Sequence, residues 1–576
     1  MPIHCRIALA ALLLTITLPF LGAHHAYPLP VFFQEWLACL LGLAAFAPLI
    51  AVSDGQRWPV PRIAALPAGL MLLGLLQRVA GIDVVTESVV LFSLYLGWAL
   101  LIMFATVRIE ACLGRERLAD ALAWALVAGA LLVAGTGILQ RWAPDIGQPF
   151  IYRGLSSLAV INGNLAQANL FADYLWLGIV ATLYLHARRR LHLAAMVPAV
   201  LMLMALSLLS GSRSVYFYTV AVSAWSAWWA WRSTAAQRSR LIGIAVLLLP
   251  ALLASQMLLD TLGANVVSAQ RIVSQGSYDP LRLTMWRAAV DIFLVHPLLG
   301  AGFDSFSREF FLRIERFPIN GVGIPEHSHN LLFEFLAEFG LCGVGLLVGC
   351  ALLWLRSIDM RRGDSATLLA LGLLLVLGLH SGLEYPLWYA QFLAIAVIAL
   401  ALGEGQRYTW QATPMHRLVA GLTIAAGSVM LLTLRQDYTR LEEATLEKAA
   451  DGATLAPQEI SDRLTRLYAD SLLRPYAAMN FAARIPLSTE DLKARLAIVQ
   501  EATHFSPIRQ GVFLEAAMLQ LDGQATAARQ LMHRAMLAHP AEIPAARELL
   551  ESAPSLQGQL RPLMEQLGDQ RGQRNF

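Results

Sequence analysis

The sequence predicts an all-α protein: a polytopic transmembrane helical bundle with a large extracytoplasmic loop and a C-terminal helical domain. Three observations support this prediction. The chain of 576 residues is 57% hydrophobic and 14% charged, with a mean hydropathy of +0.56, whereas soluble proteins contain about 25% charged residues. Long apolar runs recur from the N-terminus to residue 433. From Arg435 onward the composition is that of a soluble helical protein.

A helix needs about 17–25 apolar residues to cross a bilayer. By this criterion we expect about 12–14 spans, placed at 6–22, 35–52, 63–80, 86–107, 118–140, 166–187, 192–210, 215–231, 241–258, 331–355, 365–380, 388–402 and 417–433. The first run is interpreted as an uncleaved span rather than a signal peptide, because residues 21–25 lead directly to the next apolar segment.

Arginine is distributed unevenly between the short loops, and this predicts the orientation. One set of loops carries Arg57, Arg62, Arg108, Arg115, Arg117, Arg188, Arg189, Arg190, Arg232, Arg238, Arg240, Arg356, Arg361 and Arg362. The opposite loops carry only Arg78, Arg141, Arg153 and Arg213. The N-terminus is therefore expected in the cytoplasm, and the long loop 259–330 and the C-terminal region on the outer, periplasmic side.

Two domains are expected: a transmembrane domain over 1–433, which includes the 259–330 loop, and a periplasmic helical domain over 434–576. Within the second, residues 510–540 contain two amphipathic helices with alanines at close-packing positions, which resembles a tetratricopeptide-type hairpin. Weaker helical patterns lie at 438–450 and 489–503. This domain is either a platform for a partner protein or a small domain packed on the membrane part.

The five cysteines, Cys5, Cys39, Cys112, Cys342 and Cys350, lie in or beside apolar runs without a CxxC pair. This pattern favours buried free thiols over a disulfide or a metal site. A net charge of +3 gives no indication of a nucleic-acid partner. The sequence contains no P-loop, dinucleotide fingerprint, nucleophile elbow or HExxH motif.

The stretch His327-Ser-His329-Asn330 stands at the mouth of an apolar run and is the strongest candidate site. Glu334 and Glu338 follow inside the run. Because Asn330, Glu334 and Glu338 recur at four-residue spacing, they share one helix face. Ionisable groups at membrane depth are costly and indicate function, so we expect this face to support the histidines.

Other polar groups interrupt apolar segments on the same outer side. Asn164, Gln167 and Asn169 either line a cavity or cap the helix that holds Asp173. The turn Ser210–Ser214 places Arg213 among hydroxyls and a glycine, which favours an anion-binding role over a snorkelling one. In the patch His380–Leu387, Gly382 and Pro386 predict a turn that carries Glu384 and Tyr385.

The 259–330 loop is too long to be a simple connection. Asp279-Pro280 predicts the start of a helix that runs to His296 and lies in the membrane interface. Its Arg282 and Arg287 either approach a lipid phosphate or are ordinary surface charges. The following Gly300–Asp304 segment is interpreted as a flexible glycine turn, and His24 with His25 as a solvated loop pair.

Several arginines with one histidine, and no Asp-rich metal cluster, are typical of a site for a diphosphate leaving group. A histidine near neutral pKa can accept a proton from a hydroxyl. These residues alone indicate a membrane enzyme or transporter that handles an anionic, lipid-linked substrate.

The chain resembles the bacterial O-antigen ligase superfamily, and within it the protein O-oligosaccharyltransferases of the PglL type. The stretches that carry the resemblance are Pro28–Ala38, Asn164–Asn169, Ser210–Arg213, His296–Gly302, His327–Asn330 and His380–Pro386, in this order and spacing. The resemblance implies transfer of a glycan en bloc from undecaprenyl diphosphate to Ser/Thr hydroxyls of periplasmic or pilin proteins in the bacterial inner membrane. It implies neither a metal nor another cofactor.

The resemblance also implies residue roles. His329 is the essential histidine, and Arg213 and Arg287 bind the diphosphate, with Arg282 as the alternative to Arg287. The supporting residues are His327, Asn330, Glu384, Tyr385, Asn164, Gln167 and Asn169. How His327 and His329 divide their roles is left open.

Three other functions are weighed against protein glycosylation. Within the family these are ligation of O-antigen to the lipid A core and polymerisation of O-antigen repeats; the N-terminal signature and the long C-terminal region favour a protein acceptor. The alternative from another class is a transporter of lipid-linked glycans, for which internal repeats and mid-membrane polar residues are typical. The sequence shows no repeat.

Overall fold

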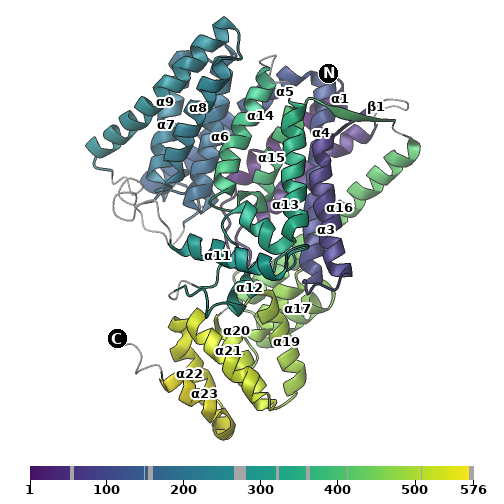
Figure 1. Ribbon diagram of the computed structural model, residues 1–576, viewed down its shortest axis with the longest axis vertical. Coiled ribbons are helices and arrows are strands. Elements are labelled where there is room, and N and C mark those ends of the chain that lie inside the picture. Colours follow the sequence, from purple (N-terminus) through teal and green to yellow (C-terminus); the bar gives the residue numbers. More distant parts are fainter. Residues whose placement is uncertain are drawn as a thin grey trace. The chain divides into compact units, whose positions relative to one another are not determined.

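The computed structural model describes residues 1–51, 57–147, 149–153, 160–264, 280–319, 323–358, 364–411, 413–449, 451–507 and 509–569. Within these ranges the chain is almost entirely helical, and one two-stranded antiparallel sheet accompanies the helices (Figure 1). The predicted all-α class is confirmed.

The helices of the membrane region follow the expected spans closely. They are α1 (Ile3–Thr15), α2 (Phe32–Phe46), α3 (Ala65–Val79), α4 (Thr86–Leu113), α5 (Arg115–Trp142), α6 (Ala168–Ala187), α7 (Leu193–Leu209), α8 (Ser214–Ala230), α9 (Ala235–Thr261), α13 (Leu331–Ser357), α14 (Ser365–Ser381), α15 (Ala390–Gly403) and α16 (Pro414–Leu446). Short 3₁₀ turns lie at Leu18–Leu21, Ala47–Ala51, Arg62–Ala64, Gly163–Leu165 and Pro386–Trp388.

Nine helical stretches of the described chain are long and apolar enough to cross a membrane, and α7, α14 and α15 are shorter apolar helices. The protein is therefore a multi-pass membrane protein. Strands β1 (Arg57–Pro61) and β2 (Arg407–Gln411) pair antiparallel, with Arg57 opposite Gln411.

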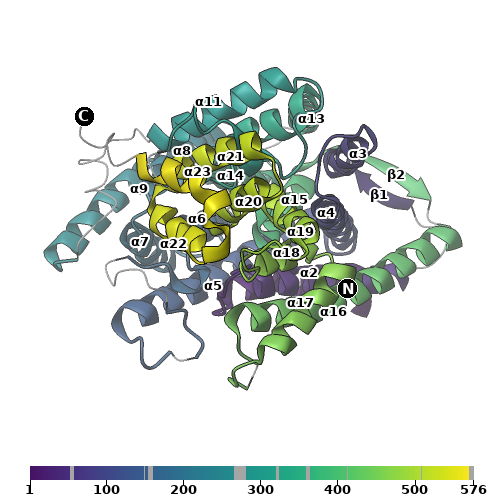
Figure 2. The same ribbon diagram turned by 90° about the horizontal axis from the view of Figure 1, so that it is seen from below.

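The remaining helices are α11 (Pro280–Val295), α12 (Phe306–Leu312), α17 (Pro457–Asp470), α18 (Arg474–Ala482), α19 (Leu492–Phe505), α20 (Arg509–Leu521), α21 (Ala525–Ala538), α22 (Ile543–Glu551) and α23 (Gln557–Asp569). Helices α20 and α21 pack together where the hairpin over 510–540 was predicted (Figure 2). Their contact is close because small side chains, among them Ala516, Ala517 and Ala535, are fully buried.

The chain divides into two compact units. The first unit contains residues 1–71, 94–278 and 346–432, and the second contains 72–93, 279–345 and 433–576. In the first unit α6 is the central helix, because it packs against α5, α7 and α14 and 94% of its most apolar window is buried. A helix that is apolar on all sides is typically enclosed in this way.

In the second unit α11 packs through Met285, Ala288, Ala289 and Ile292 into a core shared with α12 and the C-terminal helices. These four side chains are covered by protein, whereas Leu294 and Val295 near the end of α11 are exposed, so the position of this helix in the membrane interface stays a prediction. An amphipathic stripe does not by itself distinguish a membrane surface from a protein core.

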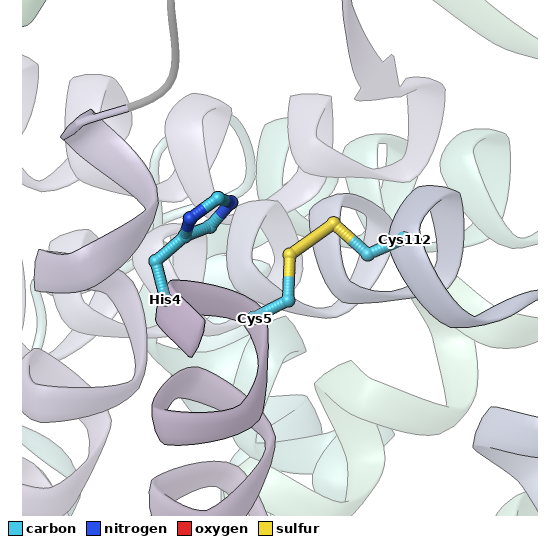
Figure 3. Close-up of side chains that lie close together, drawn as sticks. All are labelled: His4, Cys5 and Cys112. Atoms are coloured by element: carbon cyan, nitrogen blue, oxygen red, sulfur yellow. A yellow bond between two sulfur atoms is a disulfide. The ribbon is translucent and has the colours of Figure 1, made fainter. Parts of the chain in front are cut away.

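The prediction of free thiols is also wrong for two cysteines. Cys5 of α1 and Cys112 of α4 form a disulfide, and the ring of His4 lies beside it (Figure 3). The two cysteines are 107 residues apart in sequence, so no local pattern indicates their pairing. Cys39, Cys342 and Cys350 are free.

Candidate active site

The predicted site residues are distributed over both compact units. The first unit holds Arg213, Asn164, Gln167, Asn169, Glu384 and Tyr385, and the second holds Arg282, Arg287, His327, His329 and Asn330.

The histidine loop ends where α13 begins, and Asn330 sets this boundary. Its Oδ1 accepts hydrogen bonds from the backbone N–H groups of Leu332 (3.0 Å) and Phe333 (3.2 Å), which is the capping contact expected of asparagine. The preceding His329 is half-buried and has a φ of 55°. Such a left-handed backbone is uncommon for a residue with a side chain and is concentrated at functional sites.

Glu334 orients His327. His327 Nδ1 lies 2.9 Å from Glu334 Oε1, and the other oxygen of Glu334 accepts the backbone N–H of Ser328. Burial alone would lower the pKa of His327, but the adjacent Glu334 carboxylate raises this pKa above its ordinary value. The carboxylate predicted to support the histidine pair therefore acts on His327.

Glu338, predicted from its spacing to support the histidines, contacts the start of α12. It is buried, and its Oε1 accepts the backbone N–H of Phe306 at 3.3 Å. It thus fastens the start of α12 to α13. The side-chain amide of the buried Gln77 lies in the same region, and its Nε2 donates hydrogen bonds to the carbonyls of Leu299 (2.7 Å) and Glu338 (2.6 Å).

The Gly300–Asp304 segment is packed rather than flexible. The backbone N–H groups of Ala301 and Gly302 donate to the carbonyls of Ala337 and Glu338, at 2.9 and 3.1 Å. A Cβ on Gly300 would lie 2.2 Å from the Glu338 carbonyl carbon, so only glycine permits this approach. The prediction of a flexible turn is wrong because the spacing of the glycines does not reveal the helix that they contact.

Asp304 is a residue that sequence reasoning did not select. It accepts a hydrogen bond from Ser88 Oγ at 2.7 Å, and its φ is 62°. Burial raises the pKa of Asp304 to about 6, and Ser88 and His327 oppose this rise. Asp304 and Glu334 thus both act electrostatically on His327. The only sequence signal was the position of Asp304 after two glycines.

Helix α11 contacts the first turn of α13 through an aromatic pair. Trp286 stacks on Phe333, in the first turn of α13, with ring centroids 5.3 Å apart. Arg282 is half-buried and Arg287, which follows Trp286, is exposed. The second unit therefore brings the arginine-bearing helix to the start of the helix that follows His329.

In the first unit Arg213 occupies the turn between α7 and α8 and is half-buried. Gly211 has a φ of 77°, which permits the turn. The backbone N–H of Ser212 donates to Ser210 Oγ at 3.2 Å. Helix α8 begins directly after Arg213, at Ser214.

Asn164 has a structural task instead of lining a cavity or capping a helix. Its Nδ2 donates to the carbonyls of Leu21 (2.7 Å) and Phe150 (2.8 Å), and its Oδ1 accepts the N–H of Tyr152. His25 Nε2 lies 2.7 Å from the Asn164 carbonyl oxygen. The prediction that His25 is solvated is therefore wrong, and burial lowers its pKa; His24 is exposed.

Asn169 and Glu384 are brought together as predicted site residues. Asn169 Nδ2 donates to Glu384 Oε1 at 3.0 Å. Tyr385 stacks on Tyr389, with centroids 6.1 Å apart. Gln167 precedes α6 and is half-buried, and its side chain makes no capping hydrogen bond there.

Two family models and one characterised protein are similar to this chain in sequence. Residues 197–348 match the family described as O-Antigen ligase, and residues 368–553 match the family described as virulence factor membrane-bound polymerase, C-terminal. Both matches support a relationship between this chain and the O-antigen ligase superfamily. The chain is also 25% identical over 452 residues to the general O-oligosaccharyltransferase of Acinetobacter baylyi, covering 76% of this chain and 78% of that protein.

Proposed function

We propose that this protein transfers a glycan en bloc from undecaprenyl diphosphate to Ser/Thr hydroxyls of periplasmic or pilin proteins, without a metal. The observation that carries the proposal is the second unit's constellation: a loop with two histidines, one of them oriented by a buried carboxylate, attached to a helix with two arginines. The similarity to an O-oligosaccharyltransferase supports it.

In the proposed reaction the acceptor oxygen forms a bond to the anomeric carbon of the first sugar, and the bond from that carbon to the diphosphate oxygen breaks. His329 accepts the hydroxyl proton. Arg213 and Arg287 bind the departing diphosphate, because guanidinium groups remain charged and bind phosphate oxygens in pairs. Arg282 is the alternative to Arg287, and its half-buried position restricts how it approaches a ligand.

His327 is proposed as the partner of His329. The Glu334 carboxylate fixes its ring and favours its protonated form, so His327 supplies positive charge beside the reacting groups. Asn330 holds the loop through its cap. Asn169, Glu384 and Tyr385 are proposed as supporting residues of the first unit, where Asn169 bonds Glu384 and Tyr385 stacks on Tyr389. Gln167 and Asn164 are also proposed as supporting residues. Asn164 acts through the backbone segments that its side chain joins.

The proposed location is the bacterial inner membrane, with a cytoplasmic N-terminus and the 259–330 loop and the domain over 434–576 in the periplasm. The distribution of arginine supports this orientation. The domain over 1–433 would carry the transferase chemistry.

The test is a transfer assay in a bacterial host supplied with one lipid-linked oligosaccharide and one candidate pilin. We expect the pilin to gain the mass of the glycan, and His329→Ala to abolish this gain. Arg213→Lys should lower transfer by about 10–100-fold, because the planar fork of arginine is lost. The matched control is His533→Ala, an exposed histidine of α21.

Three results would contradict the proposal. Full transfer by His329→Ala would refute the assigned role of that histidine. A change confined to lipopolysaccharide would favour ligation to the lipid A core or polymerisation. Purified protein that moves the donor lipid but releases no undecaprenyl diphosphate would favour a transporter.

A further inference from the structure

Two polar contacts join α6 to the end of α14 inside the first unit. Asn169 bonds Glu384, and one turn further along α6 the Asp173 carboxylate lies 3.1 Å from His380 Nδ1. Asn169 and Asp173 are four residues apart, as are His380 and Glu384, so the two contacts lie one helical turn apart. The side chains of Asp173 and His380 are fully buried.

The contact between Asp173 and His380 is unusual for the interior of a membrane protein. Both Asp173 oxygens and both His380 ring nitrogens lie out of solvent and make no well-aligned hydrogen bond to the residues that the structure describes. Ionisable groups in membrane helices are costly and mark functional positions. A buried ion pair is also weak evidence for stability, since apolar residues often replace one without loss.

Helix α8 also approaches the Asp173 carboxylate. The Tyr218 hydroxyl of α8 lies beside the Asp173 carboxylate and beside Ser214. Ser214 is the first residue of α8 and follows Arg213 directly. Tyr218 and Ser214 are four residues apart on one face of α8, so the Asp173 carboxylate lies near the helix start that follows the turn with the predicted diphosphate ligand.

His380 also fixes the turn on its own side. Its backbone carbonyl accepts the N–H groups of Leu383 and Glu384, both at 2.8 Å. Its side chain contacts α6 at Asp173, and Glu384 contacts α6 at Asn169. The turn with Glu384 and Tyr385 is thus held to α6 at two points and to the end of α14 by its backbone.

We infer that Asp173 and His380 are positioning residues of the proposed transferase: through α6 and α8 they hold the Arg213 turn and the Glu384–Tyr385 turn in a fixed relation. This inference rests on the proposed function. Neither residue contacts the substrate. Because a misplacement of about 1 Å costs up to about 100-fold in rate, loss of the pair should lower turnover even when the protein remains folded.

The experiment compares Asp173→Asn and His380→Gln with an exchange variant, D173H/H380D, which keeps one carboxylate and one imidazole. The matched control is Thr182→Val on α6, a buried hydroxyl that bonds only its own helix, at the Gly178 carbonyl. Purified full-length variants are assayed for glycan transfer with varied donor, and for thermal unfolding in detergent.

We expect each single variant to lower kcat by about 10–100-fold with an acceptor KM close to that of the unaltered protein. The exchange variant should recover at least part of this loss, and Thr182→Val should retain full turnover. A pair that only stabilises the bundle would instead give variants that unfold more readily but turn over normally once folded, and this result would overturn the inference.

A second readout does not depend on transfer. Amide hydrogen exchange should accelerate in residues 210–214 and 381–385 of Asp173→Asn and His380→Gln, and remain unchanged in Thr182→Val. Unchanged exchange in both turns would refute the positioning role. If the unaltered protein transfers no glycan, the proposed function fails, while the exchange data still decide whether the pair holds the two turns.

Discussion

At the scale of single residues, the charge of His327 is set by its neighbours. The ring is buried, which disfavours its charged form, yet the Glu334 carboxylate at 2.9 Å reverses this preference. The backbone N–H of Ser328 holds the same carboxylate from its other oxygen. His327 is therefore a histidine whose charge persists to higher pH than that of an ordinary histidine.

Glu334→Gln should lower the pKa of His327, because burial remains while the favourable charge is removed. The limb of the pH–rate profile that reports His327 should move to lower pH. The shift is to lower pH whether the reaction needs the protonated or the neutral ring of His327, since in both cases the midpoint of the pH–rate limb follows the pKa of His327. The measurement is the rate of glycan transfer between about pH 5.5 and 8.5.

Glu326→Gln is the matched control, because Glu326 is exposed and also raises the pKa of His327, but ranks below Glu334 among the causes. It should move the limb less. An equal shift in both variants, or no shift in Glu334→Gln, would show that Glu334 does not control the charge of His327.

Residue-level predictions from sequence were successful where the interaction is local. The spacing of Asn330, Glu334 and Glu338 identified one helix face, and all three make buried or capping contacts. Which histidine Glu334 meets was not predictable, because it depends on the left-handed backbone at His329. The contacts of Asn164 were not predictable, because an amide can bond distant backbone groups as readily as a ligand.

At the scale of elements, α13 is broken at Gly340. This glycine has φ 59° and ψ −153°, and the segment before α12 packs into the break. The N–H groups of Leu341 and Cys342 donate to the carbonyls of Pro297 and Leu298, at 2.9 and 3.1 Å. A non-helical connection is thus satisfied inside the protein, as backbone at membrane depth requires.

Gly340→Ala should destabilise the second unit. The backbone conformation alone costs a residue with a Cβ about 1–3 kcal/mol, and the Cβ would lie 2.6 Å from the Leu298 carbonyl oxygen. We expect a lower thermal unfolding midpoint, and lower transfer because the segment that follows α11 is displaced. Differential scanning fluorimetry in detergent provides the measurement.

Gly345→Ala tests the specificity of this effect. Gly345 lies in the same helix, and a Cβ there would meet nothing within 4 Å. It should leave the midpoint unchanged or raise it slightly, since alanine favours helix by up to about 1 kcal/mol over glycine. Equal destabilisation by both substitutions would contradict the close approach at Gly340.

The positions of elements were largely predictable, and their contacts were not. Each predicted span coincides with a helix, since hydropathy is a local property of the sequence. The break at Gly340 and the disulfide between Cys5 and Cys112 depend on segments that meet only in the folded chain. The burial of one face of α11 likewise depends on segments that are distant in sequence.

At the scale of the whole molecule, three distant stretches of sequence build the second unit: 72–93, 279–345 and 433–576. Charged contacts connect them. The Arg308 guanidinium lies 3.0 Å from Asp83 Oδ2 and 2.8 Å from His504 Nε2, and thus joins the α3–α4 connection, α12 and α19. A linear division of the sequence at residue 433 does not anticipate a unit assembled in this way.

The titration of His504 makes this assembly sensitive to acid. Burial and the adjacent Arg308 charge lower the pKa of His504, and Asp83, Glu309 and Glu501 only partly oppose this. The unfolded chain therefore binds a proton at a pH where the folded chain does not. The stability contributed by neutral His504 is complete above the unfolded pKa of about 6.5 and is lost as the pH falls toward the folded value.

His504→Gln should consequently flatten the dependence of unfolding on pH. Between about pH 7.5 and 5.5, the unfolding midpoint of the unaltered protein should fall more steeply than that of the variant, because glutamine has no proton to bind. His533→Gln, which alters an exposed histidine of α21, should keep the steep dependence. Parallel curves for all three proteins would refute the coupling of His504 to the stability of the second unit.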